Sequence, residues 1–225
     1  MGAMGTGAGA VAGPAAAASI QVGTADEMRA LGQRLADLLR PGDLVVLSGP
    51  LGAGKTTLVQ GIGQGLNVRG PVTSPTFVIA RVHPPLGGGP ALVHADAYRL
   101  ASPAEVDDLD LDADVSSSVT VVEWGEGLVE GLAADRLEVT IAMSRDDAAG
   151  FRDDAAAFQD GAAAFHDGAA GFQDGGAGSL DGAAGFQDGL DGGSRTVRVS
   201  GVGERWVAVA VESVRCALPG TSEAL

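Results

Sequence analysis

The sequence has very little cysteine and no long apolar run. Its one cysteine, Cys216, can form neither an internal disulfide nor a cysteine metal cluster, which is compatible with a reducing cytosol. No stretch of about 18 large apolar residues exists to cross a membrane. The small, uncharged N-terminus also lacks the basic segment and bulky apolar core of a secretory signal. We therefore expect a cytoplasmic protein that does not engage a membrane.

Aromatic residues make up only 4% of the chain, so the 45% hydrophobic content overstates its core-forming capacity. Alanine (39) and glycine (36) together account for 75 of 225 residues. A length of 225 residues with this composition favours one compact domain. The glycines follow no three-residue period, which excludes a collagen-like chain.

Positive charge is also scarce: 14 basic against 29 acidic residues give a formal net charge of −15. Such a polyanion does not bind nucleic acid through a broad basic surface. We expect no DNA partner, and any role with RNA must pass through a local patch or a partner protein.

The chain divides into five segments. We expect a flexible tail at 1–19, a folded core at 20–145, an insert at 146–194, C-terminal strands completing the core at 195–217, and a second tail at 218–225. The insert repeats with a period of seven, its Phe and Asp recurring in register, and it carries −9 of the net charge. It has one large apolar residue per repeat and many glycines, unlike a coiled coil. Its composition favours an acidic disordered insert, and an array of Phe docking sites is the alternative.

Strands alternate with helices through the core. Thr24 and Glu27 have the spacing of a capping box before a helical apolar pattern, and a second helix is expected over about 55–66. Ser102 is placed to cap a short helix that starts at Pro103. Strands are expected at 20–22, 44–47, 76–82, 91–95, 119–122, 137–142, 196–201 and 207–211. This order predicts an α/β three-layer sandwich with a mainly parallel sheet and antiparallel C-terminal strands.

The strongest chemical signal is the sequence GPLGAGKTT at 49–57. It is a complete phosphate-binding pattern (Walker A), following a buried strand and opening a helix, as P-loop NTPases require. Glycines let backbone N–H groups turn toward phosphates, and the helix N-terminus adds positive potential. Lys55 is expected to reach the β- and γ-phosphates and Thr56 to offer its hydroxyl to Mg²⁺. The expected nucleotide-binding residues are Gly52, Ala53, Gly54, Lys55, Thr56 and Thr57.

Lys55 is the only lysine in the chain, since the other 13 basic residues are arginines. Its retention indicates a need for a compact ammonium group. The absence of a second lysine excludes the usual Asn-Lys-x-Asp loop that reads guanine, so an ordinary GTPase is not expected.

Two carboxylates follow buried strands. Glu123 ends the strand at 119–122, where it can hold Mg²⁺ directly or through water. Asp96 lies within HADAYRL at 94–100 and can act on water or on the outer metal shell, and both roles stay open. Helix capping or a salt bridge with Arg99 is the structural alternative. Pro75 forces Ser74 out of the helical region, so Ser74 and Thr76 form a candidate switch-like loop that senses the γ-phosphate, and a plain turn is the alternative.

Taken together, these motifs resemble the TsaE (YjeE) family, bacterial ATPases of tRNA threonylcarbamoyladenosine modification. The resemblance covers about 20–145 and rests on SGPLGAGKTTLVQG at 48–61, SPTF at 74–77, HADAYRL at 94–100 and VVEW at 121–124. It implies ATP and Mg²⁺ as cofactors, Thr56 and Glu123 as metal ligands, and Asp96 and Glu123 as catalytic residues. It also places Thr24 and Ala25 near the adenine.

The resemblance further implies work with TsaD-like and TsaB-like proteins, with tRNA met only through that complex. Modification would fall on the adenosine beside the anticodon, and hydrolysis by the isolated chain would be slow. This sequence departs from the family at Pro50, where an acid is common, and in the repeat insert. A small-molecule P-loop kinase and a nucleotide-gated binding module without turnover are the alternatives.

Overall fold

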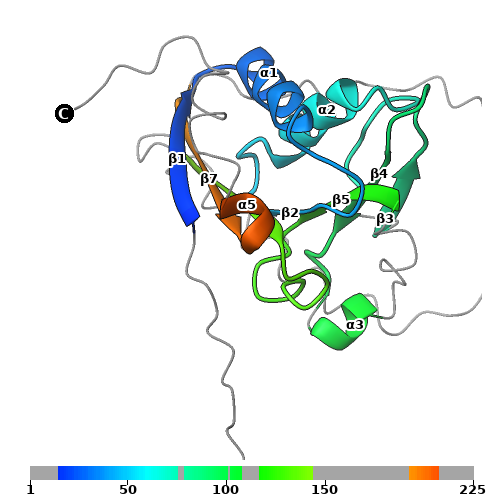
Figure 1. Ribbon diagram of the computed structural model, residues 1–225. Coiled ribbons are helices and arrows are strands. Elements are labelled where there is room, and N and C mark those ends of the chain that lie inside the picture. The colour runs from blue at the N-terminus through cyan, green and yellow to red at the C-terminus, as the bar shows by residue number, and fades with distance from the viewer. Residues whose placement is uncertain (1–14, 76–78, 101, 108–116, 144–192, 208–225) are drawn as a thin grey trace, which may run out of the picture.

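A computed structural model describes residues 15–75, 79–100, 102–107, 117–143 and 193–207. Its centre is a seven-stranded sheet with the spatial order β1-β7-β6-β2-β5-β4-β3 (Figure 1). The strands are β1 (Ala15–Val22), β2 (Leu44–Ser48), β3 (Ala80–His83), β4 (Ala91–Asp96), β5 (Ser118–Glu123), β6 (Arg136–Met143) and β7 (Arg195–Val202). The helices are α1 (Ala25–Ala36), α2 (Lys55–Gly65), α3 (Pro103–Asp107) and α5 (Glu204–Val207).

The middle of the sheet is parallel. Strand β2 pairs in parallel with both β5 and β6, and β4 pairs in parallel with β5. Antiparallel pairs lie at the two sides, β3 on β4 at one side and β7 between β6 and β1 at the other. The carboxyl ends of β2, β4 and β5 therefore meet at one edge, where α/β folds place their sites.

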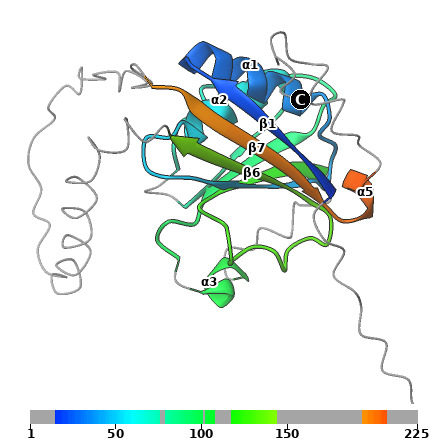
Figure 2. The same cartoon turned by 90° about the vertical axis from the view of Figure 1, so that its left-hand side faces the viewer.

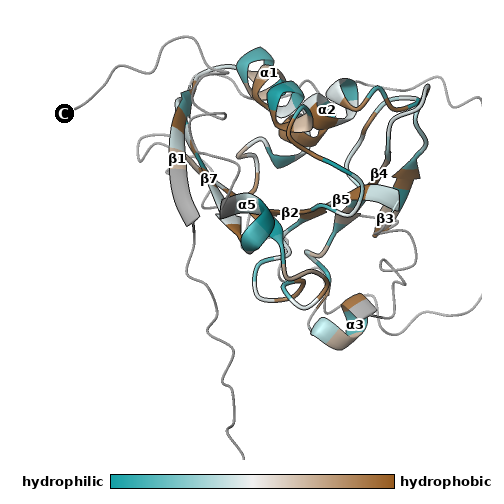
Figure 3. Cartoon of the chain, in the orientation of Figure 1, coloured by the Kyte–Doolittle hydropathy of each residue, from teal (hydrophilic) through white to brown (hydrophobic). Residues whose placement is uncertain are grey.

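Two apolar cores lie on the two faces of the sheet. Helices α1 and α2 cover one face and pack on a core that includes Leu47, Ile62 and Val121 (Figures 1 and 2). The short helix α3 and the segment after β5 contribute to the core of the other face, around Val46, Val106 and Val129. In Figure 3 strand β2, which lies between these layers, carries hydrophobic colours. This arrangement confirms the predicted three-layer α/β sandwich.

Helices α1 and α2 approach closely because glycines line their contact. A Cβ added to Gly32 would collide with the backbone of Leu58, and one added to Gly61 would collide with the backbone of Arg29. The capping box predicted for α1 is present: Thr24 accepts from the Glu27 backbone N–H, and the Glu27 carboxylate accepts from the Thr24 N–H. Within the described ranges no helix is long and apolar enough to cross a membrane.

Two sequence-based boundaries differ from the structure. Strand β1 begins at Ala15, inside the segment assigned to the tail at 1–19, and it pairs with β7 through Val22. The expected strand at 207–211 begins with a residue that is helical, since α5 spans Glu204–Val207. Gly203 has φ 91°, which ends β7, and the chain turns so that Trp206 packs over Gly201. Over residues 195–207, which the structure describes, the C-terminal segment is one strand followed by a helical turn.

Several predictions fall on other parts of the chain. The insert at 146–194 lies outside the described residues except for its last two, and so do 1–14 of the N-terminal tail and the tail at 218–225. The expected strand at 76–82 is described only from residue 79, where β3 starts at Ala80. Helix α3 begins at Pro103, with the Ser102 hydroxyl accepting from the Glu105 N–H at 3.4 Å, as predicted.

Candidate functional site: a phosphate-binding loop beside two carboxylates

The loop between β2 and α2 has the backbone shape that phosphate binding needs. Gly49, Gly52 and Gly54 have φ of 146°, 73° and 103°. A Cβ at Gly49 would lie 2.5 Å from the Ile141 carbonyl oxygen, so this position also needs the space. Gly54 is the N-cap of α2 and makes no side-chain cap, so no capping side chain stands over the amides of the first turn. These amides can therefore receive an anion.

Lys55 is folded over the loop. Its Nζ donates to the carbonyl oxygens of Gly49 and Pro50, both at 2.9 Å, and lies 3.7 Å from the centre of the Trp124 ring. The side chain is buried, and burial lowers the pKa of Lys55 to about 8, although Glu123 and Asp96 act to raise it. The exposed Pro50 thus enters the site through its carbonyl oxygen.

Glu123 is the point where three elements meet. Its Oε1 accepts from Thr56 Oγ1 on α2 at 2.9 Å, and His94 Nε2 on β4 lies 2.8 Å from the same oxygen. The Glu123 residue is only 3% exposed. The strand end, the first turn of α2 and β4 therefore fix one carboxylate next to the Thr56 hydroxyl.

Asp96 lies beside Glu123, because the two residues are register partners on β4 and β5. It is buried, and its Oδ1 accepts from the backbone N–H of Tyr98 at 2.9 Å. The Tyr98 ring in turn packs at 5.2 Å from Trp124. Both carboxylates thus lie at the edge of the sheet next to the phosphate-binding loop.

The side chains present fit a magnesium ion. Mg²⁺ prefers oxygen ligands and keeps waters and substrate phosphates in its shell, so one or two protein oxygens suffice. Thr56 and Glu123 offer such oxygens at one point, with Asp96 adjacent. Within the described residues no group of three His, Cys, Asp or Glu side chains could hold a metal alone. The donors therefore suit a site that a nucleotide completes.

The remaining predicted residues lie in other environments. Thr24 is the N-cap of α1 and its hydroxyl is used there, while Ala25 packs against the core below α1. Helix capping explains Thr24 without a ligand, so an adenine role for this pair stays a prediction. Ser74 is exposed, and Thr76 lies outside the described residues, so the switch-like loop also stays a prediction.

Sequence reasoning assigned no role to His94, although it belongs to a quoted motif. A detectable signal existed, since residues two apart on a strand share a face, and His94 precedes Asp96 by two. The stacking of Lys55 on Trp124 had no such signal, because it depends on how the chain turns after β5.

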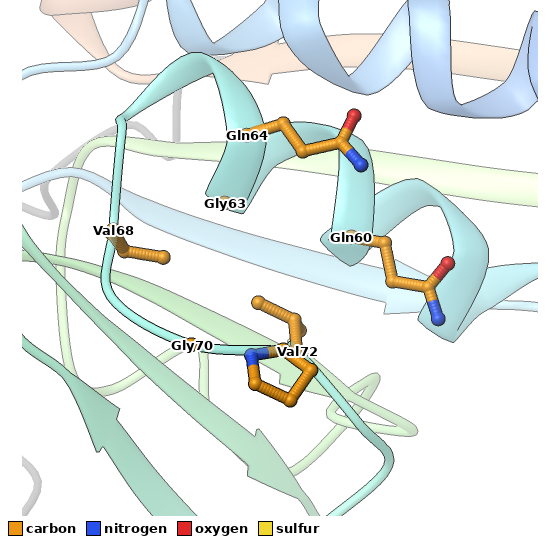
Figure 4. A pocket seen from close by; sticks show the side chains of 7 residues that line it. Gln60, Gly63, Gln64, Val68, Gly70 and Val72 are labelled. Atoms are coloured by element: carbon orange, nitrogen blue, oxygen red, sulfur yellow. The ribbon is translucent and has the colours of Figure 1, made fainter.

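A separate cavity of about 220 Å³ lies along the second half of α2 and the loop that follows it (Figure 4). Its lining comes from Gln60, Gly63, Gln64, Val68, Gly70, Pro71 and Val72. None of these residues belongs to the phosphate-binding loop, so this hollow is not the candidate nucleotide site.

Comparison with known proteins agrees with this geometry. The family model described as "Threonylcarbamoyl adenosine biosynthesis protein TsaE" matches residues 22–151. The tRNA threonylcarbamoyladenosine biosynthesis protein TsaE of Streptomyces coelicolor is 67% identical over 54% of this chain and 83% of that protein. The protein of the same name from Bacillus subtilis is 37% identical over 54% of this chain and 75% of that protein.

A solved structure shares the fold. The crystal structure of Bacillus subtilis YdiB superposes with a TM-score of 0.55 at 22% identity, covering 89% of this chain and 96% of that one. The family match covers more than half of the chain, including the phosphate-binding loop and both carboxylates. The chain therefore belongs to the TsaE family of threonylcarbamoyl adenosine biosynthesis proteins.

Proposed function

We propose that this protein is a Mg²⁺-dependent ATP-binding protein and ATPase that supports threonylcarbamoyladenosine modification of tRNA. The carrying observation is the 2.9 Å hydrogen bond between Thr56 and Glu123 at the end of a phosphate-binding loop. A P-loop hydroxyl beside a strand-end carboxylate is the arrangement that P-loop NTPases use for Mg²⁺ and the phosphates.

The chain's own residues divide the work. Backbone N–H groups at 52–57 would bind the phosphates, and Lys55 would leave its carbonyl partners for the β- and γ-phosphates. Thr56 and Glu123 would hold Mg²⁺, which when bound neutralises charge developing on the phosphates. Asp96, at the same sheet edge, would orient the attacking water or the outer shell of the metal.

We further propose that the chain acts with TsaD-like and TsaB-like proteins and meets tRNA only through them. Its net charge of −15 supports this, because such a chain does not bind a polyanion by its overall surface. We place this activity in the cytoplasm, where tRNA is modified, and we expect slow hydrolysis without the partners.

The decisive experiment depletes the protein in its host cell and measures threonylcarbamoyladenosine in total tRNA by mass spectrometry. We expect the nucleoside to fall, and wild type but not Lys55→Ala to restore it. Immunoblots showing equal amounts of both proteins provide the control. An unchanged nucleoside level after full depletion would contradict the pathway, and a screen of phosphate acceptors with labelled ATP would then test for kinase activity.

A further inference from the structure

The feature that the proposed function leaves unexplained is the imidazole of His94. His94 is fully buried on β4, in the same face of the sheet as Leu92, which belongs to the apolar core under α2. Its Nε2 lies 2.8 Å from Glu123 Oε1. Its Nδ1 is buried and has no hydrogen-bond partner among the residues that the structure describes. Glu123 is therefore the polar contact that this ring makes there.

The chemistry of the pair fixes the direction of the hydrogen bond. An ionised carboxylate has only acceptor atoms, so the proton of this contact belongs to His94 Nε2. The Thr56 hydroxyl donates to the same oxygen at 2.9 Å. The Thr56 hydroxyl and the His94 ring therefore both donate to Oε1 of Glu123. Neither of these two hydrogen bonds uses Oε2.

We propose that His94 is a positioning residue that holds the Glu123 carboxylate in the orientation that receives Mg²⁺. This inference rests on the proposed function, because it concerns a residue behind one of the proposed metal ligands. His94 touches neither nucleotide nor metal in this arrangement, since it lies behind Glu123 within the sheet layer. Partners that orient a metal ligand commonly change metal affinity by about 10- to 100-fold when removed.

A role in packing alone is the competing explanation, and the chain offers a control for it. His83 is also buried, at 4% exposure on the neighbouring strand β3, and its Nε2 likewise has no partner among the described residues. No contact between His83 and Glu123 is found in the described part of the chain. Replacing His83 therefore disturbs a buried histidine of the same sheet without touching the proposed metal ligand.

The test compares His94→Gln with His94→Asn. The amide nitrogen of Gln can occupy the place of Nε2, whereas Asn is too short to reach Glu123. Calorimetric titration with ATP, once with Mg²⁺ and once with EDTA, gives the factor by which Mg²⁺ strengthens binding. We expect the magnesium factor of His94→Asn to be about tenfold smaller than that of wild type, while its affinity for ATP in EDTA is unchanged. We expect His94→Gln and His83→Asn to keep the wild-type factor, and melting curves verify that each variant is folded.

A wild-type magnesium factor in His94→Asn would overturn the inference, whether the affinity of that variant for ATP is unchanged or reduced equally in Mg²⁺ and in EDTA. Should His94→Asn fail to fold, His94→Leu, which also lacks a donor to Glu123, is measured alone and combined with Glu123→Gln. Coupled residues predict that the second change adds little to the first, and full additivity contradicts the role. A wild-type protein that binds ATP without any magnesium effect contradicts the proposed function itself, and is thereby distinguishable.

Discussion

The ammonium group of Lys55 lies 3.7 Å from the centre of the Trp124 ring, over its face. Trp124 follows Glu123 directly and has φ 60°, a left-handed conformation that is uncommon for a bulky residue. This turn brings the ring to the lysine and to Tyr98. The positive charge of Lys55 is thus shared between the π-face and two loop carbonyls, partners that phosphate oxygens can replace.

Trp124 should therefore report nucleotide binding. The chain has two tryptophans, so Trp206→Phe leaves Trp124 as the single one. We expect the emission of this variant to change on addition of ATP, because Lys55 leaves the ring for the phosphates. The combined Trp206→Phe, Lys55→Met variant is the control and should give no such change. An ATP-saturated protein with unaltered Trp124 emission would show that Lys55 stays in place.

Removing the Lys55 charge should weaken nucleotide binding directly. Hydrogen bonds to charged groups contribute about 1.5–3 kcal/mol, so Lys55→Ala is expected to lower ATP affinity about ten- to a hundredfold. Equilibrium binding with a fluorescent ATP analogue measures the change. An affinity equal to that of wild type would refute the phosphate-binding assignment of the loop.

The same lysine predicts a pH dependence. Burial lowers the pKa of Lys55 from 10.5 to about 8, whereas bound phosphates favour the charged form and raise it again. Above about pH 8 the free protein must take up a proton to bind, so affinity should fall as pH rises. Calorimetry at about pH 9 in buffers of different ionisation enthalpy detects that uptake.

Lys55→Arg is the control for this dependence, because arginine keeps its proton throughout the range. If the variant still binds ATP, its affinity should be flat from about pH 7 to pH 9. A wild-type affinity that is equally flat would mean that the proton is present on Lys55 before the nucleotide arrives.

Local sequence patterns predicted most of the site, because each of its parts is formed by a short continuous stretch of the chain. The capping box at Thr24, the strand at Leu44–Ser48 and the loop before Lys55 each depend on neighbours within a few residues. The meeting of Thr56 and Glu123 was predictable too, since parallel strands bring their carboxyl ends to one edge. The family assignment is confirmed by the match over 22–151.

Contacts between distant segments could not be predicted in this way. Arg205 and Asp43 are 162 residues apart, and no pattern in the sequence around either residue predicts that they pair. The expected strand at 207–211 was wrong at its start for a related reason. Its apolar pattern suits a strand, but Gly203 turns the chain and Trp206 finds its place over Gly201. Tertiary packing overrode the local preference there.

The contact between α1 and α2 predicts that Gly61→Ala destabilises the fold. Alanine normally stabilises a helix by about 1 kcal/mol relative to glycine. At Gly61 the added Cβ would collide with the Arg29 backbone, so we expect a net loss of about 1–3 kcal/mol. Gly131→Ala, where a Cβ meets open space, should change stability by less than about 0.5 kcal/mol. Urea unfolding compares the two, and a Gly61→Ala protein more stable than wild type would contradict the packing.

Breaking the buried ion pair at the start of β2 should destabilise the fold without weakening nucleotide binding. Arg205 donates to both carboxylate oxygens of Asp43, at 2.7 and 2.6 Å, and to the Leu38 carbonyl oxygen at 2.8 Å. Asp43 is only 4% exposed, so Asp43→Asn leaves a charged guanidinium without its counter-ion. We expect unfolding free energy to fall by about 2–3 kcal/mol.

The more exposed pair of Arg136 and Glu138 is the matched control, and Glu138→Gln should cost less than about 1 kcal/mol because water screens that pair. Asp43 lies at the opposite end of β2 from the phosphate-binding loop, so the folded Asp43→Asn protein should bind ATP with wild-type affinity. Equal losses of unfolding free energy in the two variants would mean that the buried Asp43 pair stabilises the fold no more than the exposed pair does. Weakened ATP binding in the folded variant would show instead that β2 transmits a change at its start to the loop at its end.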